Sequence, residues 1–151
     1  MTPGPGGGGS GSAGYSGTPL PKKLGIKAGH ELAVIGAPEG FAIDGLPDGV
    51  TVHDRAEGPL DVIVSFHTSR DDLAERTPTL LEALPPDGSL WVAWPKKASR
   101  MPTDITEDVV REVLLPTGMV DNKVCAIDAT WSGLRLVLRK ELRPGRTTAA
   151  G

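Results

Sequence analysis

Residues 60–66 read LDVIVSF, an apolar and β-branched run in which only Asp61 and Ser65 are polar. A strand with one face in water alternates polar and apolar residues, whereas a continuous apolar run is typical of a strand buried inside a parallel sheet. Ser69 follows almost at once, and Asp72 stands three residues later, as in the capping box of a helix. This stretch therefore predicts a buried strand that leads directly into a helix.

The rest of the chain continues this alternation. Further strands are expected at 31–35, 50–53, 90–94, 120–127 and 134–138, and helices begin at Thr18, at Ser69 and at Asp104 or Thr106. Pro78 should kink or restart the second helix, and Gly45 and Pro47 cut short a helix after the first strand. The link 128–133 joins the last two strands and is so short that they must be antiparallel. The pattern predicts an α/β three-layer sandwich whose sheet is mostly parallel and ends in a C-terminal antiparallel hairpin.

Length and composition fit one domain. The chain has 151 residues, and residues 1–17 hold eight of its 20 glycines and no charge. We expect a flexible Gly-rich arm at 1–17, a single α/β domain at 18–143 and a disordered tail at 144–151. The one cysteine excludes an internal disulfide and fits a reducing compartment. Because the chain shows no long apolar segment and no signal sequence, we expect a cytoplasmic protein without membrane contact.

Charge is unevenly distributed along the domain. Residues 30–88 carry twelve acidic side chains against three arginines, a balance of −9, whereas residues 96–146 carry ten basic against seven acidic ones. Lys22, Lys23 and Lys27 add a second basic segment. The net charge of −3 and the 4% aromatic content argue against a nucleic-acid partner. A small anionic ligand or another protein remains as the expected partner.

The element order resembles a shortened class I methyltransferase, a Rossmann-like fold in which the last strand inserts antiparallel into the sheet. The phrase LPPDGSLWV at 84–92 is similar to the segment that leads into the fifth strand of that fold. This resemblance covers most of residues 30–139, and one strand–helix unit of a full methyltransferase is missing. It implies an S-adenosylmethionine site at the first glycine loop.

Four longer strings resemble an uncharacterised, largely actinobacterial family, domain of unknown function family 3052. They are GYSGTPLPKKLGI at 14–26, WPKKAS at 94–99, TDITEDVVRE at 103–112 and KVCAIDATWSGL at 123–134. The resemblance implies that residues 14–26 belong to the native protein. It supplies no activity, cofactor or catalytic residue.

The candidate site lies where the carboxyl ends of the strands meet, because ligands of open α/β sheets bind there. Its residues come from the loops and segments that follow the strands. They are Gly36, Gly40, Asp54, His67, Trp94, Lys96, Lys97, Asp128 and Trp131. No catalytic residue, cofactor or metal ligand set is identified, since His30 and His53 stand alone and Cys125 lies within an apolar strand.

Individual members of this site carry different chemistry. Gly36 and Gly40 suit a cofactor loop and Asp54 a ribose-binding carboxylate, but Pro38 replaces the central glycine, which favours a tight turn that binds nothing. Trp94 and Trp131 could face one another beside Lys96 and Lys97, an arrangement that suits an anionic or aromatic ligand; the alternative is a core tryptophan with solvated lysines. His67 could act as a base, hold a phosphate or, as we favour, cap the following helix.

The function predicted from these patterns is a binding or regulatory module with an anion- or nucleotide-like site at this rim. One alternative is an S-adenosylmethionine-dependent enzyme with an altered glycine loop. Another is a protein-interaction domain that uses the Gly/Pro-rich arm and the Lys22, Lys23, Lys27 segment.

Overall fold

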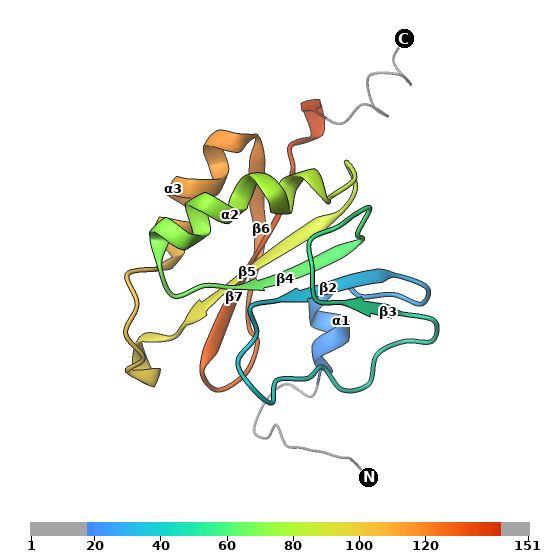
Figure 1. Ribbon diagram of the computed structural model, residues 1–151, viewed down its shortest axis with the longest axis horizontal. Coiled ribbons are helices and arrows are strands. Elements are labelled where there is room, and N and C mark those ends of the chain that lie inside the picture. The colour runs from blue at the N-terminus through green and yellow to red at the C-terminus, as the bar shows by residue number, and fades with distance from the viewer. Residues whose placement is uncertain (1–17, 143–151) are drawn as a thin grey trace.

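The computed structural model describes residues 18–142, so the predicted arm at 1–17 and tail at 144–151 lie outside the described residues. One sheet of six strands forms the centre, in the order β3-β2-β4-β5-β7-β6 (Figure 1). The strands are β2 (Glu31–Ile35), β3 (Thr51–His53), β4 (Val62–Phe66), β5 (Ser89–Pro95), β6 (Met119–Ala126) and β7 (Trp131–Leu138). The helices are α1 (Leu20–Leu24), α2 (Arg70–Glu82) and α3 (Glu107–Leu114), with 3₁₀ turns η1 (Lys97–Ser99), η2 (Leu115–Thr117) and η3 (Lys140–Leu142).

The predicted fold class is confirmed. β3, β2, β4 and β5 are parallel, and β7 inserts antiparallel between β5 and β6. All five residues of β4 are buried, as its apolar sequence predicted. β7 begins at Trp131, three residues earlier than expected, because the Asp128 carboxylate accepts hydrogen bonds from the backbone N–H groups of Thr130 and Trp131 and tightens the turn. Trp131 is therefore a strand residue and not part of the link.

The two faces of the sheet have different covers, which gives the three layers. On one face α2 and α3 pack over a core that includes Leu73, Leu80 and Leu114 (Figure 1). On the other face the short α1 contributes Leu24, while the loop 36–50 contributes Phe41. Trp91 joins α1 to the sheet, since its indole N–H donates to the Leu24 carbonyl at 3.0 Å.

Two predicted helix starts are confirmed. Ser69 accepts a hydrogen bond from the Asp72 N–H at the start of α2, and Thr106 accepts one from the Val109 N–H at the start of α3. The prediction that Thr18 caps the first helix was wrong, because the N-cap position of α1 is occupied by Pro19, which forms no side-chain hydrogen bond.

Two other helix predictions need correction. Pro78 does not restart α2, which continues through it to Glu82, while the alternative of a kink at Pro78 stays a prediction. Residues 36–50 form no helix at all, since Gly45 takes a left-handed conformation with φ 76° and Pro47 lacks a donor. In the range 18–142 no helix has the length and apolar character needed to cross a bilayer.

We expect Trp91→Ala to lower the free energy of unfolding by about 3–5 kcal/mol, because it removes a fully buried ring and leaves the Leu24 carbonyl without its donor. Val52→Ala is the control, since Val52 is 53% exposed and its truncation should cost no more than about 0.5 kcal/mol. Urea unfolding of the two variants measures the difference. A loss below about 1 kcal/mol for Trp91→Ala would show that α1 is not held by this contact.

Candidate functional site

The site lies where the connections of neighbouring strands diverge. From β2 the chain continues outward to β3, whereas from β4 it continues the opposite way to β5. A crevice opens outside the carboxyl ends of two strands that diverge in this manner, and ligands of open α/β sheets bind in it. A pocket of about 250 Å³ occupies this position and is named here the switch pocket. Its lining residues are Ile35, Gly36, Phe66, His67, Thr68, Asp72, Arg76 and Trp131.

One wall of the switch pocket is aromatic. The rings of Phe66 and Trp131 meet edge to face with centroids 5.0 Å apart, and the centroid of the Phe41 ring lies 4.9 Å from that of Phe66. Gly36 closes the end of β2 with φ 68°, and a Cβ there would lie 3.1 Å from the Phe66 carbonyl oxygen. A side chain at position 36 would be strained both by this contact and by the left-handed backbone. The glycine thus allows the ends of β2 and β4 to lie close together beside these aromatic rings.

The polar lining residues His67, Asp72 and Arg76 belong to a chain of hydrogen bonds that starts at the buried Ser65. Ser65 Oγ lies 2.6 Å from His67 Nε2, and His67 Nδ1 lies 2.8 Å from Asp72 Oδ2. Arg76 Nε donates to the other oxygen of Asp72 at 2.9 Å. A carboxylate has no proton to donate, so Nδ1 of His67 carries the proton in its contact with Asp72. When His67 is neutral, its Nε2 atom therefore accepts a hydrogen bond from the Ser65 hydroxyl.

Burial sets the protonation of this chain. It lowers the pKa of His67 and outweighs the opposing hydrogen bond to Asp72, which favours the neutral ring. For Asp72, burial acts to raise the pKa, but the hydrogen bonds from His67 and Arg76 outweigh it and bring the pKa below its ordinary value. A neutral imidazole therefore lies between a serine hydroxyl and a stable carboxylate.

This chain has the connectivity of a Ser-His-Asp triad without its accessibility. Ser65 is fully buried within β4, paired to Ile35 and Val92 of the two neighbouring strands, and does not line the switch pocket. A nucleophile must reach its substrate, and a general base must have a free nitrogen directed at it. The Ser65–His67 and His67–Asp72 hydrogen bonds instead hold α2 against the end of β4. The cap of α2 is Ser69, so the expectation that His67 caps the helix is corrected: His67 binds the Asp72 side chain instead.

The two tryptophans do not face one another, and that expectation was wrong. Trp94 pairs with Ser132 while Trp131 pairs with Pro95. Paired residues of neighbouring strands point to the same face, and successive residues point to opposite faces, so the two rings lie on opposite sides of the sheet. Trp94 is 7% exposed in the core under α2 and α3, and Trp131 is 5% exposed in the other core.

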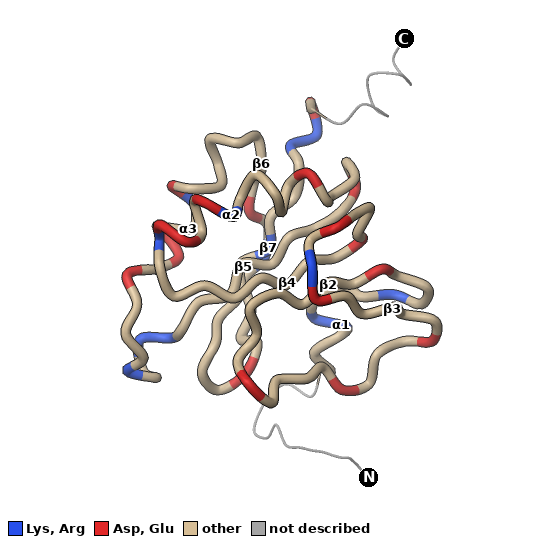
Figure 2. The backbone as a smooth tube through the Cα atoms, viewed as in Figure 1, with Lys and Arg blue, Asp and Glu red and all other residues tan. Residues whose placement is uncertain are grey.

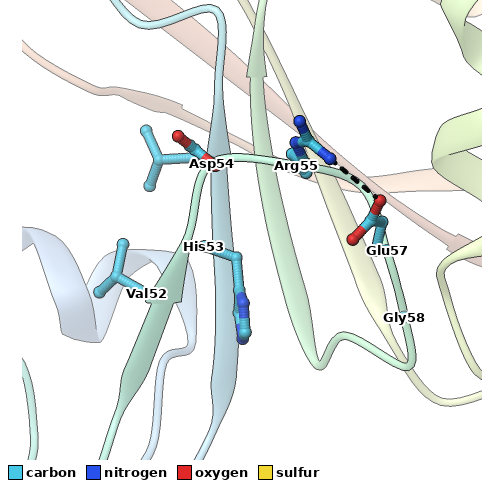
Figure 3. Close-up of a pocket in the computed structure, with 7 residues that line it drawn as sticks. Val52, His53, Asp54, Arg55, Glu57 and Gly58 are labelled. Carbon is cyan, nitrogen blue, oxygen red and sulfur yellow. Dashed lines mark ion pairs between the residues drawn. The ribbon is translucent and has the colours of Figure 1, made fainter.

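Asp54 lies apart from the glycine turn. It lines a separate, open pocket of about 720 Å³ beside the edge strand β3, with Val34, Val52, His53, Arg55, Glu57 and Gly58 (Figure 3). In that pocket Arg55 pairs with Glu57 at 3.6 Å, as the dashed line in Figure 3 marks. The predicted glycine loop and ribose carboxylate thus fall into different pockets, and Gly40 lines neither of the two.

The remaining predicted residues border the switch pocket without lining it. The Lys96 N–H donates to the Thr130 carbonyl at 2.7 Å, which places the segment after β5 beside Trp131. Lys97 is exposed, and the Asp128 carboxylate is bonded to backbone N–H groups of its own turn. The structure therefore brings together Gly36, His67 and Trp131 in one pocket, and hydrogen bonds place Lys96 and Asp128 in the turn beside Trp131.

Sequence reasoning missed five lining residues: Ile35, Phe66, Thr68, Asp72 and Arg76. Asp72 and Arg76 carried one usable signal, since an acidic and a basic residue four apart on a helix form a pair. No pattern in the sequence indicated that the Asp72 side chain would bind His67.

Among residues 18–142 no group of three or more His, Cys, Asp or Glu side chains is placed to hold a metal ion. Burial raises the pKa of the Cys125 thiol, which lies on β6 outside the pocket.

Comparison with known proteins addresses the fold. No protein-family model matches the chain, and no curated protein matches it. Among solved structures, a SAM-dependent methyltransferase from Aquifex aeolicus is 15% identical with a TM-score of 0.54, covering 76% of this chain and 85% of its own. Ribosomal protein L11 methylase from Lactobacillus delbrueckii subsp. bulgaricus is 13% identical with a TM-score of 0.51, covering 80% and 75%.

A third structure is magnesium protoporphyrin IX methyltransferase from Synechocystis with bound SAM. It is 10% identical with a TM-score of 0.51 and covers 80% of this chain and 74% of its own. Identities this low bear on the fold alone. The chain has a methyltransferase-like Rossmann fold, as its element order predicted.

The buried imidazole predicts how stability depends on pH. Because the pKa of His67 in the folded chain lies below its ordinary value of 6.5, the unfolded chain takes up the proton first on acidification. The contribution of this group is complete above pH 6.5 and is lost as the pH falls through the folded pKa. His67→Gln should flatten that part of a stability profile measured by urea unfolding between about pH 5 and pH 8.

His53→Gln is the matched control for this profile, since His53 is partly exposed and pairs with Glu31 at 2.7 Å on the sheet edge. The profile of this variant should keep the acid-side decline that His67 causes. A profile for His67→Gln that declines as steeply as the wild type would show that another group carries the dependence.

Proposed function

We propose that this protein is a binding or regulatory module that takes a small nucleotide-like ligand at the carboxyl rim of its sheet. The observation that carries the proposal is the switch pocket itself, since it lies at the divergence of β2 and β4, where this class of sheet binds ligands. Its chemistry supports a planar ring. Apolar and aromatic side chains form one wall, and a few fixed polar groups form the other.

Ring recognition follows from the two walls. Phe66 and Trp131 line the pocket and offer apolar contact area to a heteroaromatic ring. On the polar side Asp72 can accept from a ring amino group, while Arg76 can donate to a ring nitrogen or carbonyl. These are the groups that distinguish one nucleobase from another.

A second candidate is an S-adenosylmethionine-dependent enzyme, which the methyltransferase-like fold favours. Three structural details argue against it. Pro38 lies in the loop after β2, no helix follows within residues 36–50 to direct its N–H groups at a ligand, and Asp54 lies in the other pocket. The binding module is for this reason placed first.

The predicted family and the predicted cellular location form part of this proposal. The resemblance to domain of unknown function family 3052 stays a prediction, as does the cytoplasmic location, which the single cysteine supports. A protein-interaction role through the arm and the Lys22, Lys23, Lys27 segment is the third candidate. The arm lies outside the described residues, and the proposal of a protein-interaction role rests on the sequence alone.

Calorimetric titration with adenosine and with S-adenosylmethionine tests the proposal. We expect adenosine to bind with saturable heat, and Thr68→Trp to weaken that binding by at least tenfold, about 1.4 kcal/mol, because the new ring fills the pocket mouth. Thr79→Trp, at an exposed position of α2 outside the pocket, should bind like the wild type.

Two outcomes would count against the binding module. If neither compound gives heat at about 1 mM, the pocket is not a nucleoside site. If S-adenosylmethionine binds much more tightly than adenosine, the enzyme candidate takes first place.

A further inference from the structure

The segment that follows β5 frames the mouth of the switch pocket. At its start the Lys96 N–H donates to the Thr130 carbonyl at 2.7 Å, next to the pocket residue Trp131. At its end the Thr103 hydroxyl donates to the Thr68 carbonyl at 2.7 Å, and Thr68 itself lines the pocket. The part between, residues 96–100, is named here the basic turn. The segment 96–103, which contains the basic turn, is therefore tied at one end beside Trp131 and at the other to Thr68.

Three cationic side chains of the basic turn have no acidic partner. Within residues 18–142, no carboxylate lies within 4.0 Å of the charged groups of Lys96, Lys97 or Arg100. The nearby acids Asp104 and Asp128 accept hydrogen bonds from backbone N–H groups instead. In Figure 2 the turn is the blue segment at the lower left of the view, after β5.

Four arginines in the same range behave differently, because they form ion pairs with the chain itself. They are Arg55, Arg70, Arg76 and Arg111. Unpaired cations in a single short turn beside a pocket are free to bind an anion from outside.

The backbone holds these charges in place. The Ser99 hydroxyl donates to the Lys96 carbonyl at 2.6 Å and accepts from the Met101 N–H at 3.2 Å. Arg100 has φ 62°, the one non-glycine residue with positive φ among those described. This conformation costs energy for a residue with a side chain, and such residues cluster at functional sites. Glycine or asparagine would fit the backbone better, so an arginine there suggests that its side chain has a use.

The volume of the pocket decides what must lie outside it. At about 250 Å³ it falls below the roughly 300–1,000 Å³ of pockets that enclose a whole drug-sized ligand. It can hold a ring, and the rest of a nucleotide must extend along the rim. On the β3 side the rim carries the exposed carboxylates Glu39 and Asp54. On the β5 side it carries the basic turn, so an anionic extension is directed there.

We propose that the basic turn holds the phosphate chain of a nucleoside di- or triphosphate whose ring lies in the switch pocket. Three unpaired cations match the charge of a diphosphate or triphosphate better than that of a monophosphate. This inference rests on the proposed nucleotide-like ligand and names its class. A sulfonium ligand such as S-adenosylmethionine is not expected there, because it has no phosphate chain.

Calorimetric titration of the full chain with adenosine, adenosine monophosphate and adenosine diphosphate tests the inference. In the wild type the affinity should rise along the series, by at least tenfold from adenosine to the diphosphate, and the rise should shrink with added salt. The triple variant Lys96→Ala, Lys97→Ala, Arg100→Gly should bind all three compounds with the adenosine affinity. Its melting temperature should be no lower than that of the wild type, because the three side chains form no ion pair and glycine suits the positive φ at position 100.

The control variant is Lys22→Ala with Lys27→Ala, which removes two exposed cations outside the switch pocket and should keep the full series. Equal affinity for adenosine and the diphosphate in the wild type overturns the phosphate site and leaves the ring site standing. A rise that persists in the triple variant overturns the assignment to the basic turn. Absence of binding by all three compounds overturns both the ring site and the phosphate site.

Discussion

Burial of β4 on both faces is the constraint on which the rest of the molecule depends. Its residues alternate between the two cores, and its backbone pairs with β2 on one side and β5 on the other. Ser65 is the one polar side chain of the strand, and an unmet buried hydroxyl costs about 1–3 kcal/mol. His67 supplies the partner of Ser65, and Asp72 in turn binds His67. The same contacts therefore satisfy the core, fix α2 over the sheet and form the polar wall of the switch pocket.

The loop 36–50 gives this fold its particular pocket. Without a helix after β2, the face near α1 is covered by loop side chains such as Phe41, which packs against Phe66. The pocket is consequently small and aromatic, and no helix N-terminus is directed into it from that loop. Recognition must then come from ring contacts inside the pocket and from side-chain charge along the rim. This explains why a methyltransferase-like fold and an S-adenosylmethionine site are separate questions here.

Charge on the rim follows the strand order. Carboxylates gather on the β3 side and unpaired cations on the β5 side, so the rim has a direction that an anionic ligand would follow. Most arginines near the helices are already paired, which reserves their charge for the fold. The basic turn differs because its neighbouring acids are occupied by backbone N–H groups. An exposed charge of this kind adds little stability, and its value lies in binding.

The sequence by itself determined the strands, their order along the chain and the helices that follow β4 and β5, but it wrongly predicted a short helix after β2. The apolar run at 60–66, the cap Ser69 and a short link after Asp128 each act over a few residues, and local physics suffices to read them. It also placed Gly36, His67 and the lysines near one rim. Only the tertiary structure decided that Trp94 and Trp131 lie on opposite faces, because this depends on the register between β5 and β7. The separation of Asp54 from Gly36 and the bond from His67 to Asp72 were likewise set by how distant segments pack, which no local pattern encodes.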